Sequence, residues 1–215
     1  MGRLNDQLFS IIISVPAVVI AFTIQGYAKA FVADRLGDKT PRFQGRLTLN
    51  PAAHIDLIGL IMILICHFGW SKPMETNPRA YKRGYKDSIK VSIAAPLGNL
   101  IAGFLGALLY VAFIKFFYFS IPQSVYVVLV NMISAILSVN VGLAIFNLLP
   151  LPGLAGFDIF RDLAPKKFYQ VADKIYQYQF IILIGVILIG GSIISIPASA
   201  IINGFIYIAR IIFRI

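Results

Sequence analysis

Two polar side chains, Gln25 and Lys29, stand inside an apolar stretch that is long enough to cross a membrane. Residues four apart lie on one face of an α-helix, with about 5–6 Å between their Cβ atoms, so the amide and the ammonium would act together. Because an ammonium in the hydrocarbon region costs roughly 3 kcal/mol on insertion scales, such a lysine usually faces a polar site. The alternative is that Lys29 lies near the helix end and extends to the lipid headgroups.

A second group of residues interrupts a later apolar helix, in the segment Asn147-Leu148-Leu149-Pro150-Leu151-Pro152-Gly153-Leu154-Ala155-Gly156. Irregular backbone at membrane depth is tolerated only where it is buried in protein or lines a cavity. We therefore expect Asn147, Pro150 and Pro152 to line a binding site together with Gln25 and Lys29. The simpler alternative is a helix end with a Pro-Gly stop.

Metal-ligating residues are few and scattered. His54, His67 and Asp158 are the candidates for a zinc site, and Cys66 is the single cysteine, which leaves no intrachain disulfide or thiolate cluster. A zinc centre requires nearly fixed ligand distances, which scattered residues rarely meet. We therefore expect no metal and keep His54, His67 and Asp158 as the alternative ligand set.

The composition determines the environment of these residues. The chain has 215 residues, of which 59% are hydrophobic and 13% charged, and its mean hydropathy is +0.83. One core of this size cannot bury so much apolar surface, so the sequence predicts a single integral membrane domain in the lipid bilayer. The net charge of +10 lies in short loops, where it reports membrane orientation and does not indicate nucleic-acid binding.

The apolar pattern predicts an all-α, multi-pass membrane protein. Residues 8–33, 89–119, 125–149 and 179–196 are long enough to cross, whereas 57–68 is too short and is expected to be re-entrant or interfacial. If Pro197 turns the chain back, Arg210 and Arg214 lie on the cytoplasmic side. Alternatively, residues 198–212 are short enough to lie in the interface. Alternating residues 42–49 predict a short hairpin or edge strand, and residues 163–178 an amphipathic interfacial helix.

The distribution of Lys and Arg predicts the orientation. If residues 57–68 do not cross, only Arg3 and Lys115 face the other side, which is a strong positive-inside bias. This topology places the N-terminus outside the cytoplasm and the Gln25 site near the cytoplasmic side. The residues then gathered on the cytoplasmic side are Arg35, Lys39, Arg42, Arg46, Lys72, Arg79, Lys82, Arg83, Lys86, Lys90, Arg161, Lys166, Lys167 and Lys174.

Five ordered motifs carry a family resemblance. They are TIQGYAKAFVADRLGD, QGRLTLNPAAHID, GWSKPMETNP, IAAPLGN and NLLPLPGLAG. Together they resemble the site-2 protease family of intramembrane zinc metalloproteases, in its compact bacterial branch. The resemblance runs from about residue 22 to 161, and it implies a three-helix protease-like core over about 8–162, followed by C-terminal membrane helices over about 178–214.

The sequence departs from the family pattern at the catalytic positions. The family has His-Glu-x-x-His where this chain has Gln25-Gly26-Tyr27-Ala28-Lys29, and Leu-Asp-Gly where it has Leu154-Ala155-Gly156. In the family the two histidines and the aspartate hold zinc, and the glutamate is the general base that deprotonates the zinc-bound water. With Gln25, Gly26, Lys29 and Ala155 at these positions, both the zinc and the base should be missing.

These departures suggest a pseudoprotease that binds a transmembrane helix or another membrane-protein client. We expect the Lys29 ammonium to replace the lost cation and to pair with helix-terminal carbonyls, Gln25 or a carboxylate such as Asp158. The family's substrate groove implies that a client would add as an extended strand beside the segment from Phe43 to Thr48. The alternatives are an active zinc protease with relocated ligands, and a membrane scaffold or small permeation module whose pocket binds an anion.

Overall fold

The protein is almost entirely helical. The computed structural model describes the backbone of residues 2–66 and 69–214, and their side chains except at 2–8, 64–66, 183, 186–190 and 192. Within these ranges no strand forms, and a single antiparallel bridge joins Ile55 to Ser71. The elements in chain order are α1 (Gly2–Arg35), α2 (Thr40–Phe43), η1 (Pro51–Ala53), α3 (Leu57–Cys66), η2 (Pro78–Ala80), α4 (Tyr85–Phe117), α5 (Gln123–Asn147), α6 (Ala155–Leu163), α7 (Pro165–Gln177) and α8 (Gln179–Phe213).

Four segments are long and apolar enough to cross a bilayer: Phe9–Arg35, Tyr85–Phe117, Gln123–Asn147 and Ile193–Phe213. The predicted all-α, multi-pass membrane architecture is thereby confirmed. The first three segments correspond to the crossings predicted at 8–33, 89–119 and 125–149. Helix α3 has 10 residues, which is fewer than a crossing needs, as the sequence indicated.

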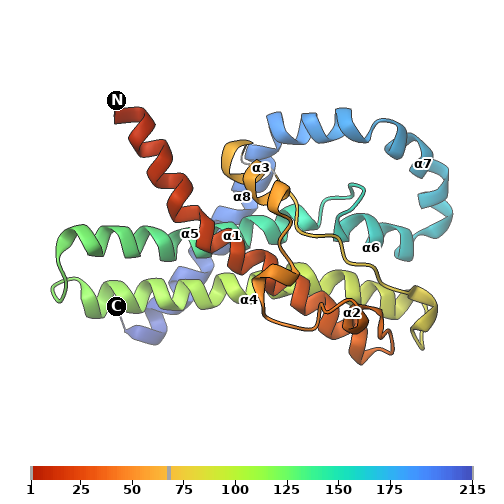
Figure 1. Cartoon of the computed structure of the whole chain (residues 1–215), viewed down its shortest axis with the longest axis horizontal. Coiled ribbons are helices and arrows are strands. Elements are labelled where there is room, and N and C mark those ends of the chain that lie inside the picture. The colour runs from red at the N-terminus through yellow and green to blue at the C-terminus, as the bar shows by residue number, and fades with distance from the viewer. Residues whose placement is uncertain (1, 67–68, 215) are drawn as a thin grey trace.

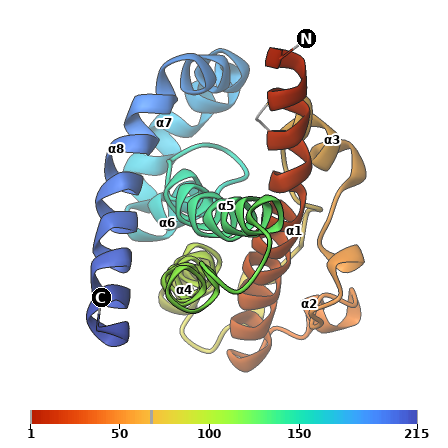
Figure 2. The same cartoon turned by 90° about the vertical axis from the view of Figure 1, so that its left-hand side faces the viewer.

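Helices α4 and α5 form the centre of the molecule, and α1 packs against both. Figure 1 shows α4 and α5 side by side, and Figure 2 shows them end-on between α1 and α8. Glycines allow the close packing: a Cβ on Gly103 would lie 2.8 Å from Val141 Cγ2, and one on Gly98 would lie 2.8 Å from Ala28 Cβ. Small residues at such contacts let helix backbones approach one another in lipid.

The C-terminal helix differs from the prediction. Instead of turning at Pro197, α8 continues as one helix to Phe213 and crosses α4 and α5, where Ala198 packs with Ala107, Leu137 and Val141. A proline removes one backbone hydrogen bond, and in an apolar setting the surrounding helix bonds are too costly to abandon. The predicted division into a crossing at 179–196 and a separate stretch at 198–212 is therefore wrong, because both belong to α8, and the apolar span lies at Ile193–Phe213.

The end of α8 lies at the connection between α4 and α5. Lys115 Nζ donates to the Phe213 carbonyl at 2.5 Å, and the Phe116 and Phe213 rings meet edge to face. Arg210 and Arg214 therefore belong to the end of the molecule that carries Lys115. They do not join the basic loops at the opposite end.

The predicted hairpin at 42–49 is also wrong, because residues Thr40–Phe43 form the helical turn α2. The Asp38 carboxylate accepts from the Thr40 amide at 2.9 Å, and Pro41 occupies the first turn, where its missing N–H does no harm. Gly45, with φ of 69°, then turns the chain out of the helix. These local signals outweigh the alternating pattern.

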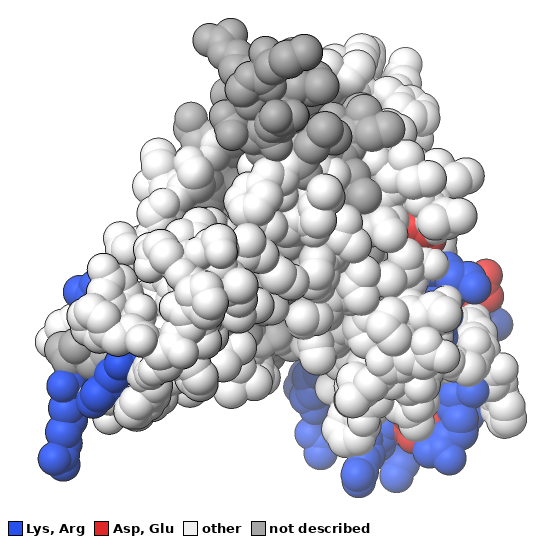
Figure 3. All heavy atoms as spheres, turned by 60° about the vertical axis from the view of Figure 1, so that its left-hand side comes forward, with Lys and Arg blue, Asp and Glu red and all other residues white. Residues whose placement is uncertain are grey.

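Charged side chains gather at one end of the molecule. Figure 3 shows a dense group of Lys and Arg there and a broad uncharged surface across the middle. The amphipathic prediction for 163–178 corresponds to α7, whose Phe168 and Ala172 are buried against Phe157. Its other face carries exposed lysines and tyrosines at the molecular surface.

Candidate functional site

The Gln25 amide joins three helices and a loop. Its Oε1 accepts hydrogen bonds from Asn99 Nδ2 of α4 at 3.1 Å and from Asn147 Nδ2 of α5 at 2.8 Å. Its Nε2 donates to Ser71 Oγ at 3.2 Å. Gln25 and Asn99 are buried, so these bonds form away from bulk solvent. The amide therefore acts as a structural connection at the centre of the site.

Gly26 is in contact with His54, which leaves no room for a side chain. A Cβ built on Gly26 would lie 2.3 Å from His54 Nδ1, closer than real Cβ contacts come. His54 is 2% exposed, and its Nε2 lies 2.7 Å from the Thr48 carbonyl oxygen. Burial lowers the pKa of His54, with the Thr48 carbonyl acting in the opposite sense and Arg46 adding to the decrease. The neutral imidazole thus occupies the space beside the α1 backbone.

Lys29 lies one turn further along α1 and is partly buried. Among the described residues it forms no ion pair, and no hydrogen bond of its ammonium is found. The carboxylate expected as its partner, that of Asp158, accepts instead from Arg161 Nη1 at 3.0 Å. Gln25 and Lys29 share a helix face, as predicted, but they have separate contacts.

The Pro-Gly segment folds back so that α6 begins against the end of α5. A Cβ on Gly156 would lie 2.1 Å from the Leu148 carbonyl oxygen, so only glycine permits this approach. Gly153 has φ of 86°, in the region that glycine adopts without strain. Ala155, near the end of the segment, is the first residue of α6 and is buried. The irregular backbone lines a cavity, as the sequence indicated.

A cavity of about 550 Å³ unites these features. Its walls come from α1, from the extended segment 69–74, from the end of α5 and from the start of α6. Of the residues predicted for the site, eight line it: Gln25, Gly26, Lys29, His54, Asn147, Pro152, Ala155 and Asp158. Phe43 and Pro150 are not among the lining residues, and Phe43 is 86% exposed on α2.

Four further polar or charged residues belong to the site but were not predicted. Arg46 and Lys72 line the cavity, Ser71 lines it and accepts from Gln25, and Asn99 donates to Gln25. Ser71 and Asn99 occur within motifs that carried the resemblance, GWSKPMETNP and IAAPLGN. Arg46 and Lys72 also lie within such motifs, QGRLTLNPAAHID and GWSKPMETNP. That signal could have identified all four residues, although it does not show which of them face the cavity.

The cavity does not offer the donors that zinc prefers. The positions that would hold the metal carry an amide, an ammonium and a methyl group, from Gln25, Lys29 and Ala155. Among the described residues, no three His, Cys, Asp or Glu side chains are close enough to hold a metal ion. In the alternative set, His54 is bonded to Thr48, Asp158 is paired with Arg161, and His67 lies outside the described residues.

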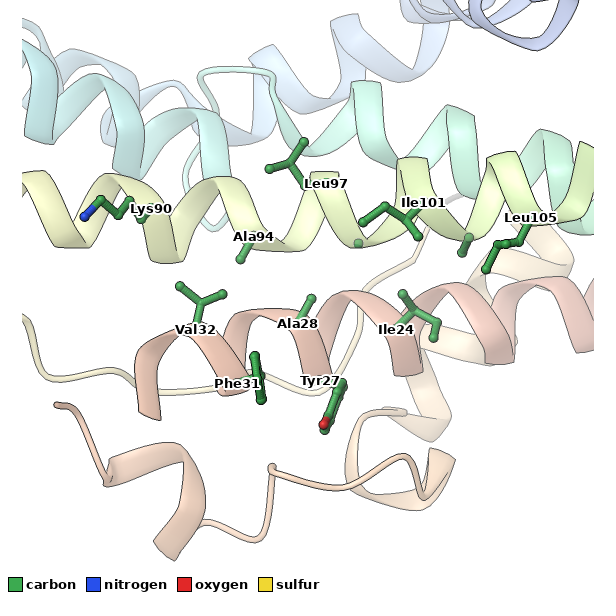
Figure 4. Close-up of a pocket in the computed structure, with 12 residues that line it drawn as sticks. Ile24, Tyr27, Ala28, Phe31, Val32, Lys90, Ala94, Leu97, Ile101 and Leu105 are labelled. Atoms are coloured by element: carbon green, nitrogen blue, oxygen red, sulfur yellow. The ribbon is translucent and has the colours of Figure 1, made fainter. Parts of the chain in front are cut away.

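A second hollow, lined mainly by apolar side chains, lies between α1 and α4. It measures about 540 Å³, and Figure 4 shows its α1 wall, with Ile24 and Ala28, facing its α4 wall. On α4, Leu97, Ile101 and Leu105 are each at least half exposed, as expected of side chains that meet lipid or another apolar partner. Lys90 marks one end of this groove.

Comparison with known proteins places the chain in a family. No family model matches the chain, and no solved structure matches it. It is 38% identical over 165 residues to the "Putative zinc metalloprotease YwhC" of Bacillus subtilis, an alignment that covers 77% of this chain and 75% of the relative. Identity of this extent shows that the chain belongs to the zinc-metalloprotease family of that Bacillus subtilis protein.

Proposed function

We propose that this chain is a catalytically inactive, site-2-protease-like membrane protein that binds a segment of another membrane protein. The observation that carries the proposal is the amide junction at Gln25. Where the resemblance calls for the first zinc-binding histidine, an amide accepts two hydrogen bonds from Asn99 and Asn147 and donates one to Ser71. This side chain holds α1, α4 and α5 together and has little capacity left for a metal.

The contact between Gly26 and His54 supports the same proposal. A general base at position 26 needs a side chain, and its Cβ alone would fall 2.3 Å from the buried His54 ring. The ring is held by Thr48, so moving it away breaks a hydrogen bond. The first ligand position and the base position are thus both taken up by structural contacts, those of the Gln25 amide and the His54 ring.

The metal content of the detergent-purified protein tests inactivity. We expect zinc near background in the wild type and in the variant His54→Ala/His67→Ala/Asp158→Ala. A matched positive control carries Gln25→His, Lys29→His and Ala155→Asp, which restores the three zinc ligands implied by the resemblance and leaves Gly26 in contact with His54. About one zinc per wild-type chain, lost in the triple alanine variant, would instead support an active protease with relocated ligands. That alternative has one observation in its favour, namely that His54 and Asp158 line the same cavity.

The groove between α1 and α4 supports the binding part of the proposal. Its exposed leucine and isoleucine side chains offer an apolar surface to a helix within the bilayer. The cavity beside it is bordered by the extended segment 69–74, along which an unwound client could lie. This segment, rather than the turn from Phe43 to Thr48, is the extended backbone at the site.

Photocrosslinking from the groove tests client binding. A photoreactive amino acid at Leu97 or Ile101 should yield discrete membrane-protein adducts, because both side chains face outward at the groove. The matched control is Phe180 on α8, which is 71% exposed and distant in sequence from the groove. Equal adducts from all three positions, or none from the groove, would argue against a client at this surface.

The orientation in the cell membrane belongs to the same proposal. We place the basic end and the cavity toward the cytoplasm and both chain ends on the other side, because α8 ends beside Lys115. Reporter fusions at the N-terminus and the C-terminus should both report an extracytoplasmic location. A cytoplasmic signal from either fusion would contradict this topology.

A further inference from the structure

The cavity at the end of α1 contains an excess of positive charge. Its charged lining residues are Lys29, Arg46 and Lys72, opposed by the one carboxylate of Asp158. Three positive groups against one negative group leave an excess of two. Asp158 is moreover already paired with Arg161, which also bonds Asp162. The lining cations are therefore not neutralised by the described side chains.

Arg46 is the most informative of these cations, because it is only 6% exposed. Its guanidinium donates to the carbonyls of Ala53 and Pro73, and no carboxylate pairs with it among the described residues. Burial lowers the pKa of Arg46, which reflects the unfavourable environment of an uncompensated charge. The group stays protonated at any physiological pH, and buried charges in proteins are normally paired.

Lys29 and Lys72 add two ammonium groups to the charge of Arg46. Lys29 is partly buried and Lys72 is exposed at the rim, and neither forms an ion pair with a described residue. Helix α6 begins in the cavity wall at Ala155 without a side-chain N-cap, so its first amides add partial positive charge there. An anion in the cavity would be attracted by positive charge from four separate parts of the chain.

We propose that this cavity binds a phosphate group. An excess of two positive charges matches a phosphate better than a single carboxylate, and ammonium groups with helix amides are common phosphate ligands. The group has two possible sources, the headgroup of an anionic phospholipid and a soluble phosphate compound. The inference concerns this cavity alone and does not depend on client binding in the α1–α4 groove.

Thermal unfolding of the full chain in phosphatidylcholine nanodiscs tests the proposal. At constant ionic strength, inorganic phosphate should raise the Tm with saturation. Lys29→Gln and Lys72→Gln should each weaken the apparent affinity about tenfold or more, as expected for the loss of a charged hydrogen bond. The control is Lys86→Gln, an exposed lysine on α4 outside the cavity lining, which should respond like the wild type.

A second experiment, in which an anionic lipid is added to the nanodiscs, distinguishes the two sources. If a headgroup is the ligand, adding phosphatidylglycerol to the nanodiscs raises the Tm of the wild type but not of Lys29→Gln, and added phosphate then has no further effect. If the ligand is soluble, phosphate acts equally with either lipid. The proposal is overturned if neither phosphate nor phosphatidylglycerol stabilises the wild type, or if both lysine variants respond as the wild type does.

Discussion

Helix α1 carries two groups of polar residues about ten positions apart, and the two are completed in opposite ways. At the C-terminal end, Asp34 accepts from Arg42 Nε and Nη2 at 2.9 and 2.8 Å and pairs with Lys39. Asp38, which is 1% exposed, accepts from the amides of Thr40 and Asn77. In the cavity around Lys29, three cations face one carboxylate that is bonded elsewhere.

The two groups differ in whether the chain itself provides partners for their polar side chains. At the corner formed by α1 and α2, the carboxylates of Asp34 and Asp38 find their partners within the chain itself. Tyr81, which packs there, has its pKa raised to about 12, mainly by burial. Such closed networks stabilise a fold and leave nothing for a ligand. In the cavity, by contrast, the chain does not provide carboxylate partners for the lining cations among the described residues. Binding sites are the places where a protein leaves polar groups for something else to satisfy.

The largest expected effect is a difference in the free energy of unfolding between one substitution in each region. Asp38→Ala should lower the free energy of unfolding by about 3 kcal/mol, because it removes a buried carboxylate that accepts from the amides of Thr40 and Asn77. Lys29→Met should leave stability unchanged or increase it, since it removes a partly buried, unpaired ammonium. Chemical denaturation in detergent measures both. Strong destabilisation by Lys29→Met would mean that Lys29 is as structural as the corner.

The Gln25 junction should behave like the corner although it lies in the cavity. Gln25→Leu preserves shape but removes the acceptor for Asn99 and Asn147, and should cost about 2 kcal/mol of stability. Ser71→Ala is the matched control, since it removes only the longer bond of 3.2 Å. Equal losses from the two variants would show that the junction is not the structural connection described above.

The contact between Gly26 and His54 permits a sharper test by a double-mutant cycle. Gly26→Ala should destabilise by roughly 1 kcal/mol net, because overpacking against His54 exceeds the gain in helix propensity. In a His54→Ala background the same substitution should become neutral or stabilising, because the clash is gone. Additive effects of the two substitutions would indicate that the ring does not fill the space beside Gly26.

The smallest expected effect is a pH dependence from His54. Its folded pKa lies below the ordinary value of 6.5, so near and below that pH the unfolded state binds more protons. The contribution of His54 is fully present above pH 6.5 and decreases as the pH falls through that value toward the folded pKa. Between pH 7.5 and 5.5, the Tm of the wild type should therefore fall further than the Tm of His54→Asn, by up to a few degrees. Since His67 is present in both proteins, its titration cancels, and parallel pH profiles would contradict a buried neutral ring.

Much of the architecture follows from short stretches of the chain. Three crossing helices and the short α3 follow from the lengths of their apolar runs, because a helix must reach a minimum length to cross the bilayer. The hairpin prediction failed because Asp38 and Pro41 form a helical turn that alternation does not reveal. The sequence left the path after Pro197 open, because helix contacts with α4 and α5 decide whether a proline ends a helix or lies within it.

By itself, the sequence determined that this is a multi-pass, helical membrane protein whose residues 25, 26, 29 and 155 lack the zinc-protease side chains, because composition and spacing are properties of the chain. Only the tertiary structure decided what those residues do. It joined Gln25 to Asn99, Asn147 and Ser71, which are 46 to 122 positions away. It also brought Arg46 and Lys72 to the cavity of Lys29, since burial and charge balance depend on neighbours in space.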